Sequence, residues 1–319
     1  REIQDHCEKI FAPVGEAARR LGVKLSFHPG QFCVLASESD EIVDRSILEF
    51  EYHADMARWM GYGTSWHDHG FKINVHIAGR RGPQGIVNAL QKLSPEARNL
   101  ITIENEENKY GIDDALSLVD HVAIVLDVHH HWVREGTYIQ ANEERVQRVQ
   151  DSWRGVRPVL HYSISREDVL VNHATTNRPD MESLLLAGYK KQKLRAHSNF
   201  YWNKPVNEWA LSFRENFDIM CESKAKNLAS FALFEEAKRY AGLEMYKSHE
   251  TEEETEHPLK EESEALIRGD VPPSRKPEKD NPSNQKKFNM KIIEENKSFE
   301  AKIAEFKVKT LKLKSVLLT

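Results

Sequence analysis

Short runs of apolar residues alternate with longer amphipathic stretches through most of this chain. The apolar runs predict seven strands, which cover residues 23–29, 72–79, 100–105, 122–130, 157–163, 193–199 and 217–223. The stretches between them repeat apolar residues with helical spacing and cover residues 44–61, 82–93, 112–120, 142–155, 181–192 and 223–242. Strands that alternate with helices in this way are typical of a parallel sheet.

A (β/α)8 barrel is the fold that this repetition favours, since single barrels of this type commonly span about 250 residues. Seven strands are one fewer than a closed barrel needs, and only a helical stretch, residues 3–22, precedes the first of them. The sequence also begins at Arg1 and not at a methionine. We therefore predict a TIM-type barrel domain over residues 1–245 that lacks its first strand.

Residues 246–319 have a different composition from the rest of the chain. Their first part is rich in Glu, Lys, Pro and Ser, and it cannot bury enough apolar surface to offset the entropy of ordering. Apolar residues return with helical spacing among lysines from residue 288 onward. We predict a charged, largely disordered tail with a terminal helix, which either stays solvated or binds nucleic acid or a partner.

The net charge and the cysteines argue against several kinds of partner and of metal site. The net charge is −5, so no general positive field attracts a polyanion and any contact with nucleic acid must be local. The three cysteines, Cys7, Cys33 and Cys221, lack CxxC spacing, which argues against disulfides and against thiolate zinc sites. This cysteine usage favours an intracellular location, which would be the cytoplasm of a bacterium or the nucleus of a eukaryote. No apolar run reaches the roughly 18 residues of a membrane span.

Eight potential metal ligands lie at or just after the ends of the apolar runs. They are His28, His76, Glu104, Asp127, His130, His161, His197 and Glu222. The carboxyl ends of barrel strands meet at one mouth, so these side chains should converge there. A lone histidine near a strand end is more often a hydrogen-bonded structural residue. Ionisable groups at nearly every strand end, however, would be costly to bury unless cations neutralised them.

The ligand types indicate the metal and the reaction. Imidazoles mixed with carboxylates, and no thiolates, suit Mn²⁺, Zn²⁺ or Fe²⁺ better than Ca²⁺ or Mg²⁺. Three carboxylates, Glu104, Asp127 and Glu222, with five histidines can hold two or three ions, and we expect these carboxylates to be catalytic. Ions about 3.5–4 Å apart stabilise both oxygens of a phosphoryl displacement, which favours a nuclease or phosphatase. A sugar isomerase barrel also holds two metals, although its ligands lean toward carboxylates.

Two short motifs lie beside these ligands. In the tract of residues 129–131, neighbouring strand side chains would face opposite ways, so we expect His130 to be the ligand and His129 to be structural. Arg80 and Arg81 follow a predicted strand and could contact phosphates at the barrel mouth, although a surface turn fits them equally well.

The motifs carry a family resemblance. HPGQF (28–32), NVHIAG (74–79), TIEN (102–105), LDVHHHW (126–132), HYS (161–163), RAHSNFYW (195–202) and MCESKAK (220–226) resemble, in this order, UV damage endonuclease, a TIM-barrel relative of endonuclease IV. The similarity covers roughly residues 10–240. It implies that the chain, as a monomer, cleaves double-stranded DNA immediately 5′ of UV photoproducts and some other lesions and leaves a 3′-hydroxyl. It also implies a cluster of up to three ions, usually manganese.

The resemblance also implies roles for individual residues. The first metal site would consist of His28, His76 and Glu104. The second would consist of Asp127, His161 and Glu222, with Glu104 bridging to it. His130 and His197 would belong to a third site. Gln31 and Phe32 fall where the family inserts two side chains, usually Gln and Tyr, into the duplex beside the lesion. A damaged base step costs less to unstack than an intact one, which would let such a pair select lesions by deformability.

The chain departs from the family at three places. The first strand, which brings a Tyr and an Asn to the DNA, is absent, and the tail beyond about residue 250 has no counterpart. Val159 stands where the family usually has a carboxylated lysine that helps to bind metal, so we predict that the third ion is weakly held or absent. An abasic-site endonuclease or sugar isomerase on the same barrel and an inactive lesion-binding protein remain the alternatives.

Overall fold

The structure, a computed structural model, describes residues 2–240. Within them, six strands form one parallel sheet in which neighbours in sequence are also neighbours in space. The strands are β1 (Ser26–Phe27), β2 (Lys72–His76), β3 (Ile101–Glu104), β4 (Ala123–Asp127), β5 (Val159–Tyr162) and β6 (Asp218–Cys221). Strands β3, β4 and β5 are buried along their whole length, which explains why they read as nearly continuous apolar runs.

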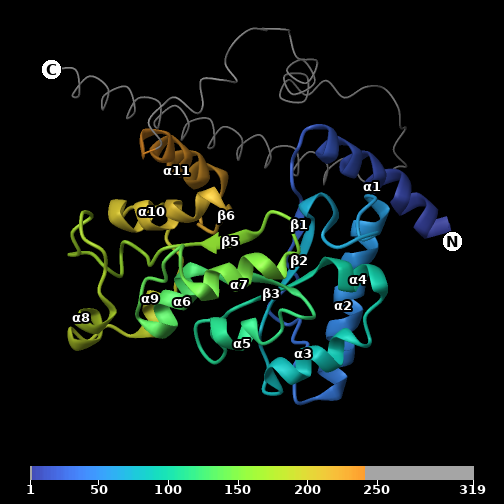
Figure 1. The fold of residues 1–319 in the computed structure, drawn as a ribbon, viewed down its shortest axis with the longest axis horizontal. Helices are drawn as coiled ribbons and strands as arrows, with labels where there is room; N and C mark the ends of the chain where they lie inside the picture. Colours follow the sequence, from blue (N-terminus) through green and yellow to red (C-terminus); the bar gives the residue numbers. More distant parts are fainter. Residues whose placement is uncertain (1, 241–319) are drawn as a thin grey trace, which may run out of the picture. The chain divides into compact units, whose positions relative to one another are not determined.

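Helices connect successive strands and lie around the sheet (Figure 1). They are α1 (Glu2–Arg20), α2 (Asp40–Trp59), α3 (Gly82–Leu90), α4 (Pro95–Leu100), α5 (Ile112–Leu116), α6 (Val128–Glu135), α7 (Glu144–Ser152), α8 (Met181–Leu186), α9 (Lys191–Leu194), α10 (Lys204–Leu211) and α11 (Asn227–Tyr240), with 3-10 turns η1 (Asp68–Gly70) and η2 (Ser212–Glu215). Six of the predicted strands and the alternation of strand and helix are confirmed.

The predicted strand at residues 193–199 is wrong. Its beginning lies in α9, and its remainder makes a single antiparallel bridge between Ser165 and His197. Strand β5 instead pairs directly with β6, with His161 opposite Met220. Leu194, the one large apolar residue of the run, packs in a separate cluster with Trp132, so no apolar face remains for the sheet.

The strand predicted over residues 122–130 ends early, at Asp127. The Asp127 side chain accepts a hydrogen bond from the His130 backbone N–H at 2.7 Å and caps α6, as acidic residues commonly do at a helix N-terminus. The helix ends at Glu135 and is followed by Gly136, whose φ of 77° is a left-handed conformation that suits glycine. Residues 129–131 are therefore helical, and the argument from strand alternation does not apply to them.

The two edges of the sheet, β1 and β6, approach each other through side chains. Lys24 Nζ donates to Asp218 Oδ2 at 2.5 Å, and Arg157 Nε donates to the other oxygen of Asp218 at 2.7 Å. No strand pairing joins β1 to β6 within residues 2–240. An ion pair between residues 194 positions apart indicates that the sheet curls, as an incomplete barrel would.

The hydrophobic core lies between the sheet and the helices. Phe50 of α2, Ile86 of α3 and Val149 of α7 are fully buried in one cluster with the side chains of the strands. No helix among the described residues is long and apolar enough to cross a membrane. The disordered tail and terminal helix predicted for residues 246–319 lie outside the described residues.

Candidate metal centre

Most of the candidate ligands lie along one edge of the sheet. Six of them stand within or directly after the last residues of a strand: His28, His76, Glu104, Asp127, His161 and Glu222. The strand register pairs His76 with Glu104 and Asp127 with His161. Because all strands run in the same direction, their carboxyl ends bring these side chains, far apart in sequence, to one place.

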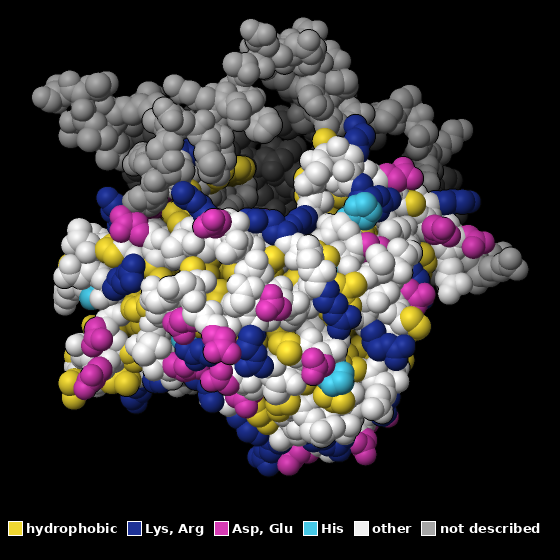
Figure 2. All heavy atoms as spheres, in the orientation of Figure 1, with side chains coloured by type: hydrophobic (Ala, Val, Ile, Leu, Met, Phe, Trp, Pro, Cys, Tyr) yellow, Lys and Arg dark blue, Asp and Glu magenta, His cyan; other side chains and the backbone are white. Residues whose placement is uncertain are grey.

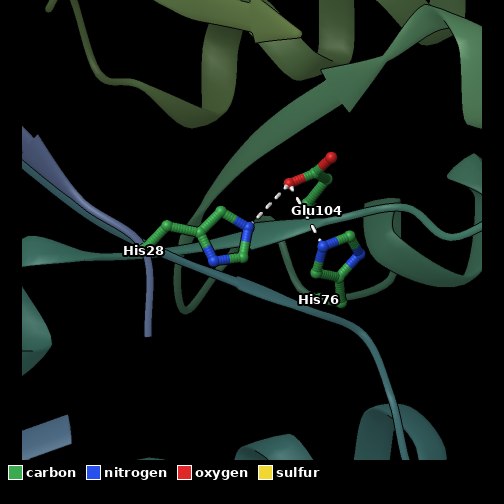
Figure 3. A group of neighbouring side chains, drawn as sticks. All are labelled: His28, His76 and Glu104. Atoms are coloured by element: carbon green, nitrogen blue, oxygen red, sulfur yellow. Dashed lines mark ion pairs between the residues drawn. The ribbon is translucent and has the colours of Figure 1, made fainter. Parts of the chain in front are cut away.

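The first group consists of His28, His76 and Glu104, whose donor atoms lie within 4.8 Å of one another. Both imidazoles face the carboxylate, with Nε2 of His28 at 3.8 Å and Nε2 of His76 at 4.0 Å from Glu104 Oε2 (Figure 3). Nδ1 of His28 lies 2.9 Å from the Pro29 carbonyl and donates to it, which leaves the Nε2 lone pair on the side of Glu104. Burial lowers the pKa of His28, which favours the neutral form that binds metals.

The second group consists of Glu104, Asp127, His161 and Glu222, and it shares Glu104 with the first. Nδ1 of His161 lies 2.9 Å from Glu222 Oε1 and 3.2 Å from Glu104 Oε2. Despite these short distances, His161 Nδ1, Glu104 Oε1 and Asp127 Oδ2 are buried polar atoms without a hydrogen-bond partner among the described residues. Buried polar atoms are nearly always paired, so orphaned atoms that converge on one point fit a cation.

The electrostatics of the second group agree with this fit. Burial alone would raise the pKa of Glu104, but His161 and His76 hold that pKa well below its usual range. Burial raises the pKa of Asp127 to about 7. Burial alone would lower the pKa of His161, but Glu104 and Glu222 raise it to about 9. Without metal, protons therefore stabilise the crowded carboxylates, and a divalent cation would compete for the same place.

Sequence analysis missed the residues that orient Glu104. Asn74 Nδ2 donates to Glu104 Oε2, and Thr102 Oγ1 donates to Asn74 Oδ1 at 2.7 Å. Asn74 and Thr102 are both completely buried. Asn74 lies two residues before His76 and therefore on the same face of β2, so the alternation of polar and apolar residues in KINVH is a signal that could have identified it.

The sequence pattern also did not identify a buried lysine near the second group. Lys72 begins β2, on the same face as Asn74 and His76, and its side chain is only 2% exposed. Its Nζ lies 3.2 Å from His161 Nε2, the ring nitrogen that faces away from the carboxylates. Burial lowers the pKa of Lys72 to about 8.

His130 and His197 belong to neither group within the described part of the chain. Nδ1 of His130 lies 3.0 Å from the Asn105 carbonyl, and the Asn105 side chain in turn pairs with both backbone groups of Asp127. The ring centroids of His130 and His197 are 6.2 Å apart. His129 stacks on Trp132 instead, and burial holds its pKa well below the usual range.

The residues expected to probe DNA protrude from the loop after β1. Phe32 is 79% exposed, although large apolar side chains are usually covered. Two hydrogen bonds hold the turn that presents it: Gly30 N donates to Glu49 Oε1 at 3.2 Å, and Cys33 N donates to the Gly30 carbonyl at 2.9 Å. Gln31 is also exposed, beside Phe32.

The two arginines after β2 already have acidic partners. Arg81 donates to Asp40 at 2.7 Å and to the Glu38 carbonyl at 2.6 Å, which ties this loop to the start of α2. Arg80 pairs with the Glu38 carboxylate at 3.1 Å but is 77% exposed. Figure 2 shows basic and acidic side chains intermixed over the face it presents, in keeping with the net charge of −5.

Known proteins are similar to this chain in sequence and in fold. The sequence profile of the family described as UV-endonuclease UvdE matches residues 2–252. A UV DNA damage endonuclease of Bacillus cereus (strain G9842) is 25% identical over 250 residues, which cover 73% of this chain and 69% of that protein. A putative UV-damage endonuclease of Acanthamoeba polyphaga mimivirus is 32% identical over 165 residues, 49% of each chain.

The crystal structure of SacUVDE superimposes with a TM-score of 0.54 and 23% sequence identity, over 75% of this chain and 73% of that one. This similarity concerns the fold, and it confirms the TIM-type barrel that the apolar pattern predicts. The family profile spans most of the chain and all the strand ends described above. The chain therefore belongs to the UV-endonuclease UvdE family of DNA repair endonucleases.

Proposed function

We propose that this chain incises DNA immediately 5′ of UV photoproducts by metal-assisted hydrolysis of the phosphodiester bond. The observation that carries the proposal is the pair of ligand groups joined by one carboxylate, Glu104. Two ions held by such groups would activate water and neutralise the charge that develops on the phosphate and the leaving oxygen. Manganese fits the mixed donor set, and zinc is the second choice.

The side chains of the two groups have separate tasks in this proposal. His28 and His76 would hold one ion through their Nε2 atoms. Asp127, His161 and Glu222 would hold the other, and Glu104, which belongs to both groups, would supply negative charge to both ions. Asn74 would keep Glu104 in place, since partners that orient a ligand commonly change metal affinity by about 10- to 100-fold. Glu104, Asp127 and Glu222 are the residues for which we propose catalytic roles.

Lesion recognition would depend on the loop after β1. The exposed ring of Phe32 can stack in the space that opens when a damaged base step unstacks, and the Gln31 amide can contact the bases beside it. The hydrogen bonds that hold this turn would reduce the entropy lost on binding. Arg80 is exposed enough to exchange Glu38 for a DNA phosphate, whereas Arg81 would mainly keep the loop in position. In this proposal the substrate is double-stranded DNA, which a monomer of the protein binds. Residues 1–245 would form the nuclease domain.

An incision assay tests the proposal. The full chain, supplied with Mn²⁺, is incubated with end-labelled duplexes that carry one photoproduct, one abasic site or no lesion. We expect one cut directly 5′ of the photoproduct, a 3′ end that a DNA polymerase can extend, and loss of cutting with a chelator. Cutting of the abasic duplex alone would favour an abasic-site endonuclease. Binding of the photoproduct duplex without any cut would make the chain a lesion-binding protein and overturn the proposal.

A further inference from the structure

Backbone pairing between β3 and β4 stops before Asp127. The register of these strands ends with Glu104 opposite Val125, whereas the register of β4 with β5 reaches Asp127, which lies opposite His161. The Asn105 side chain continues the pairing on the β3 side. Asp127 N donates to Asn105 Oδ1 at 2.9 Å, and Asn105 Nδ2 donates to the Asp127 carbonyl at 3.0 Å. A side-chain amide carries the same donor and acceptor as a peptide group, so Asn105 takes the place of one further ladder position.

Two hydrogen bonds from His130 complete this arrangement. His130 N donates to Asp127 Oδ1 at 2.7 Å, and Nδ1 of the same residue donates to the Asn105 carbonyl at 3.0 Å. Asn105 and Asp127 are completely buried, and His130 is 6% exposed. Buried polar groups that satisfy one another hold a single arrangement, because a rearrangement would leave one of them unpaired. The backbone of Asp127 and its Oδ1 are therefore fixed.

These hydrogen bonds leave one oxygen of Asp127 available. Asp127 Oδ2 is buried and has no hydrogen-bond partner among residues 2–240. Asp127 belongs to the second group together with Glu104, and Asn105 directly follows Glu104 in the sequence. A side chain at a binding site must be held within about 0.5 Å of its place to function well. One residue thus connects the strand that carries the shared carboxylate to the backbone of the next carboxylate.

We infer that Asn105 is a positioning residue of the metal centre. Its side-chain amide fixes the Asp127 backbone relative to Glu104, so that both carboxylates face the same divalent cation. Asn105 acts through Asp127 and not as a ligand, because its amide oxygen and nitrogen both face the Asp127 backbone. The inference deepens the proposed function and rests on it.

Another buried asparagine offers a matched control. Asn203 is completely buried, and its side chain also joins two backbone groups: it accepts from Val206 N at 3.1 Å and donates to the Asn177 carbonyl at 2.7 Å. Asn203 belongs to neither ligand group of the described residues. Asn203→Ala therefore removes the same kind of buried hydrogen bonds as Asn105→Ala but spares the metal centre. The two variants separate a loss of stability from a loss of ligand position.

Metal affinity and stability are measured on the full chain for wild type, Asn105→Ala and Asn203→Ala. Each protein is dialysed to equilibrium against graded free Mn²⁺, bound metal per chain is determined by mass spectrometry, and urea unfolding is followed without metal. We expect Asn105→Ala to bind one ion about 10- to 100-fold more weakly than wild type, as commonly follows when the partner of a ligand is removed. Asn203→Ala should unfold at lower urea but keep the wild-type metal affinities.

The same titration in an Asp127→Asn background tests whether Asn105 acts through Asp127. The loss of the carboxylate charge should itself weaken one ion, and Asn105→Ala should then weaken it by less than about a further twofold, because residues that act through each other are not additive. Asn105→Ser, which keeps a hydroxyl for one of the two backbone groups, takes the place of Asn105→Ala if that variant does not fold, with the same expectation.

Three results would overturn the inference: unchanged metal affinity in the Asn105 variant, an equal loss of affinity in Asn203→Ala, or the same factor with and without the Asp127 carboxylate. The proposed function stands in each of these cases if wild type binds two ions and incises damaged DNA. A wild-type chain that binds no Mn²⁺ would overturn the proposed function and the inference with it.

Discussion

Replacement of Glu104 by glutamine should remove one ion and weaken a second. Glu104 is the residue that the two ligand groups share, and glutamine keeps its shape but not its charge. The first group would retain only the neutral imidazoles of His28 and His76. The second would keep the carboxylates of Asp127 and Glu222. We therefore expect the ion of the first group to be lost and the ion of the second to be retained with lower affinity.

The size of the effect can be estimated from one distance in the structure. Glu104 Oε2 lies 3.2 Å from His161 Nδ1, and a cation held by both atoms would lie no farther than this from the carboxylate. A unit positive charge at that distance from a carboxylate is stabilised by about 5 kcal/mol at an effective dielectric constant of about 20. A divalent ion carries twice that charge, while the desolvation of a buried carboxylate offsets part of the gain. A net loss of about 4 kcal/mol would weaken binding about a thousandfold.

The assay measures bound metal per chain, incision of a photoproduct duplex and circular dichroism on the same preparations. We expect Glu104→Gln to abolish incision and retain the fold, because the apolar core is formed by other residues. Glu222→Gln is the matched control, since it belongs to the second group alone and should spare the ion of the first. Near-wild-type incision by Glu104→Gln with unchanged metal content would refute the assignment of this residue.

Three further predictions concern the loop, the support of the ligands and pH. Joint replacement of Gln31 and Phe32 by alanine should weaken binding to damaged duplex by about 1–3 kcal/mol per lost stacked base and leave intact duplex unaffected; an equal loss on both in a titration would contradict lesion reading. Asn74→Ala should weaken metal binding by about 10- to 100-fold although no ligand is removed, and an unchanged metal titration would show that Glu104 needs no such support. His67 is completely buried, and its Nδ1 donates to the Phe71 carbonyl at 3.0 Å. Burial lowers the pKa of His67 from 6.5 to about 4, so stability is full above pH 6.5 and falls by about 3 kcal/mol as the pH drops to 4. Denaturant unfolding of His67→Asn should lose this part of the pH dependence, and an unchanged slope would contradict the assignment.

The order of strands and helices and the positions of most candidate ligands can be predicted from local sequence patterns alone. Parallel strands that are buried on both faces are rich in apolar residues, so β3, β4 and β5 stand out as local runs, and β2 stands out by its buried Ile73 and Val75. A polar residue at the carboxyl end of such a run lies at the carboxyl edge of the sheet. For this reason His76, Glu104 and Asp127 could be expected to converge without any coordinates.

The positions of the remaining residues depend on contacts between distant parts of the chain. The segment that carries His197 is placed by Leu194 packing against α6 and by the Arg195–Glu107 pair, contacts between parts of the chain far apart in sequence. The Asp127 cap decided that the next residues form a helix, and with it the direction of His130. Lys72 lies in an apolar run, and only the three-dimensional arrangement puts its amine beside His161. A local pattern records whether a residue is buried, but not which distant side chain it meets, because that depends on how the whole sheet curls.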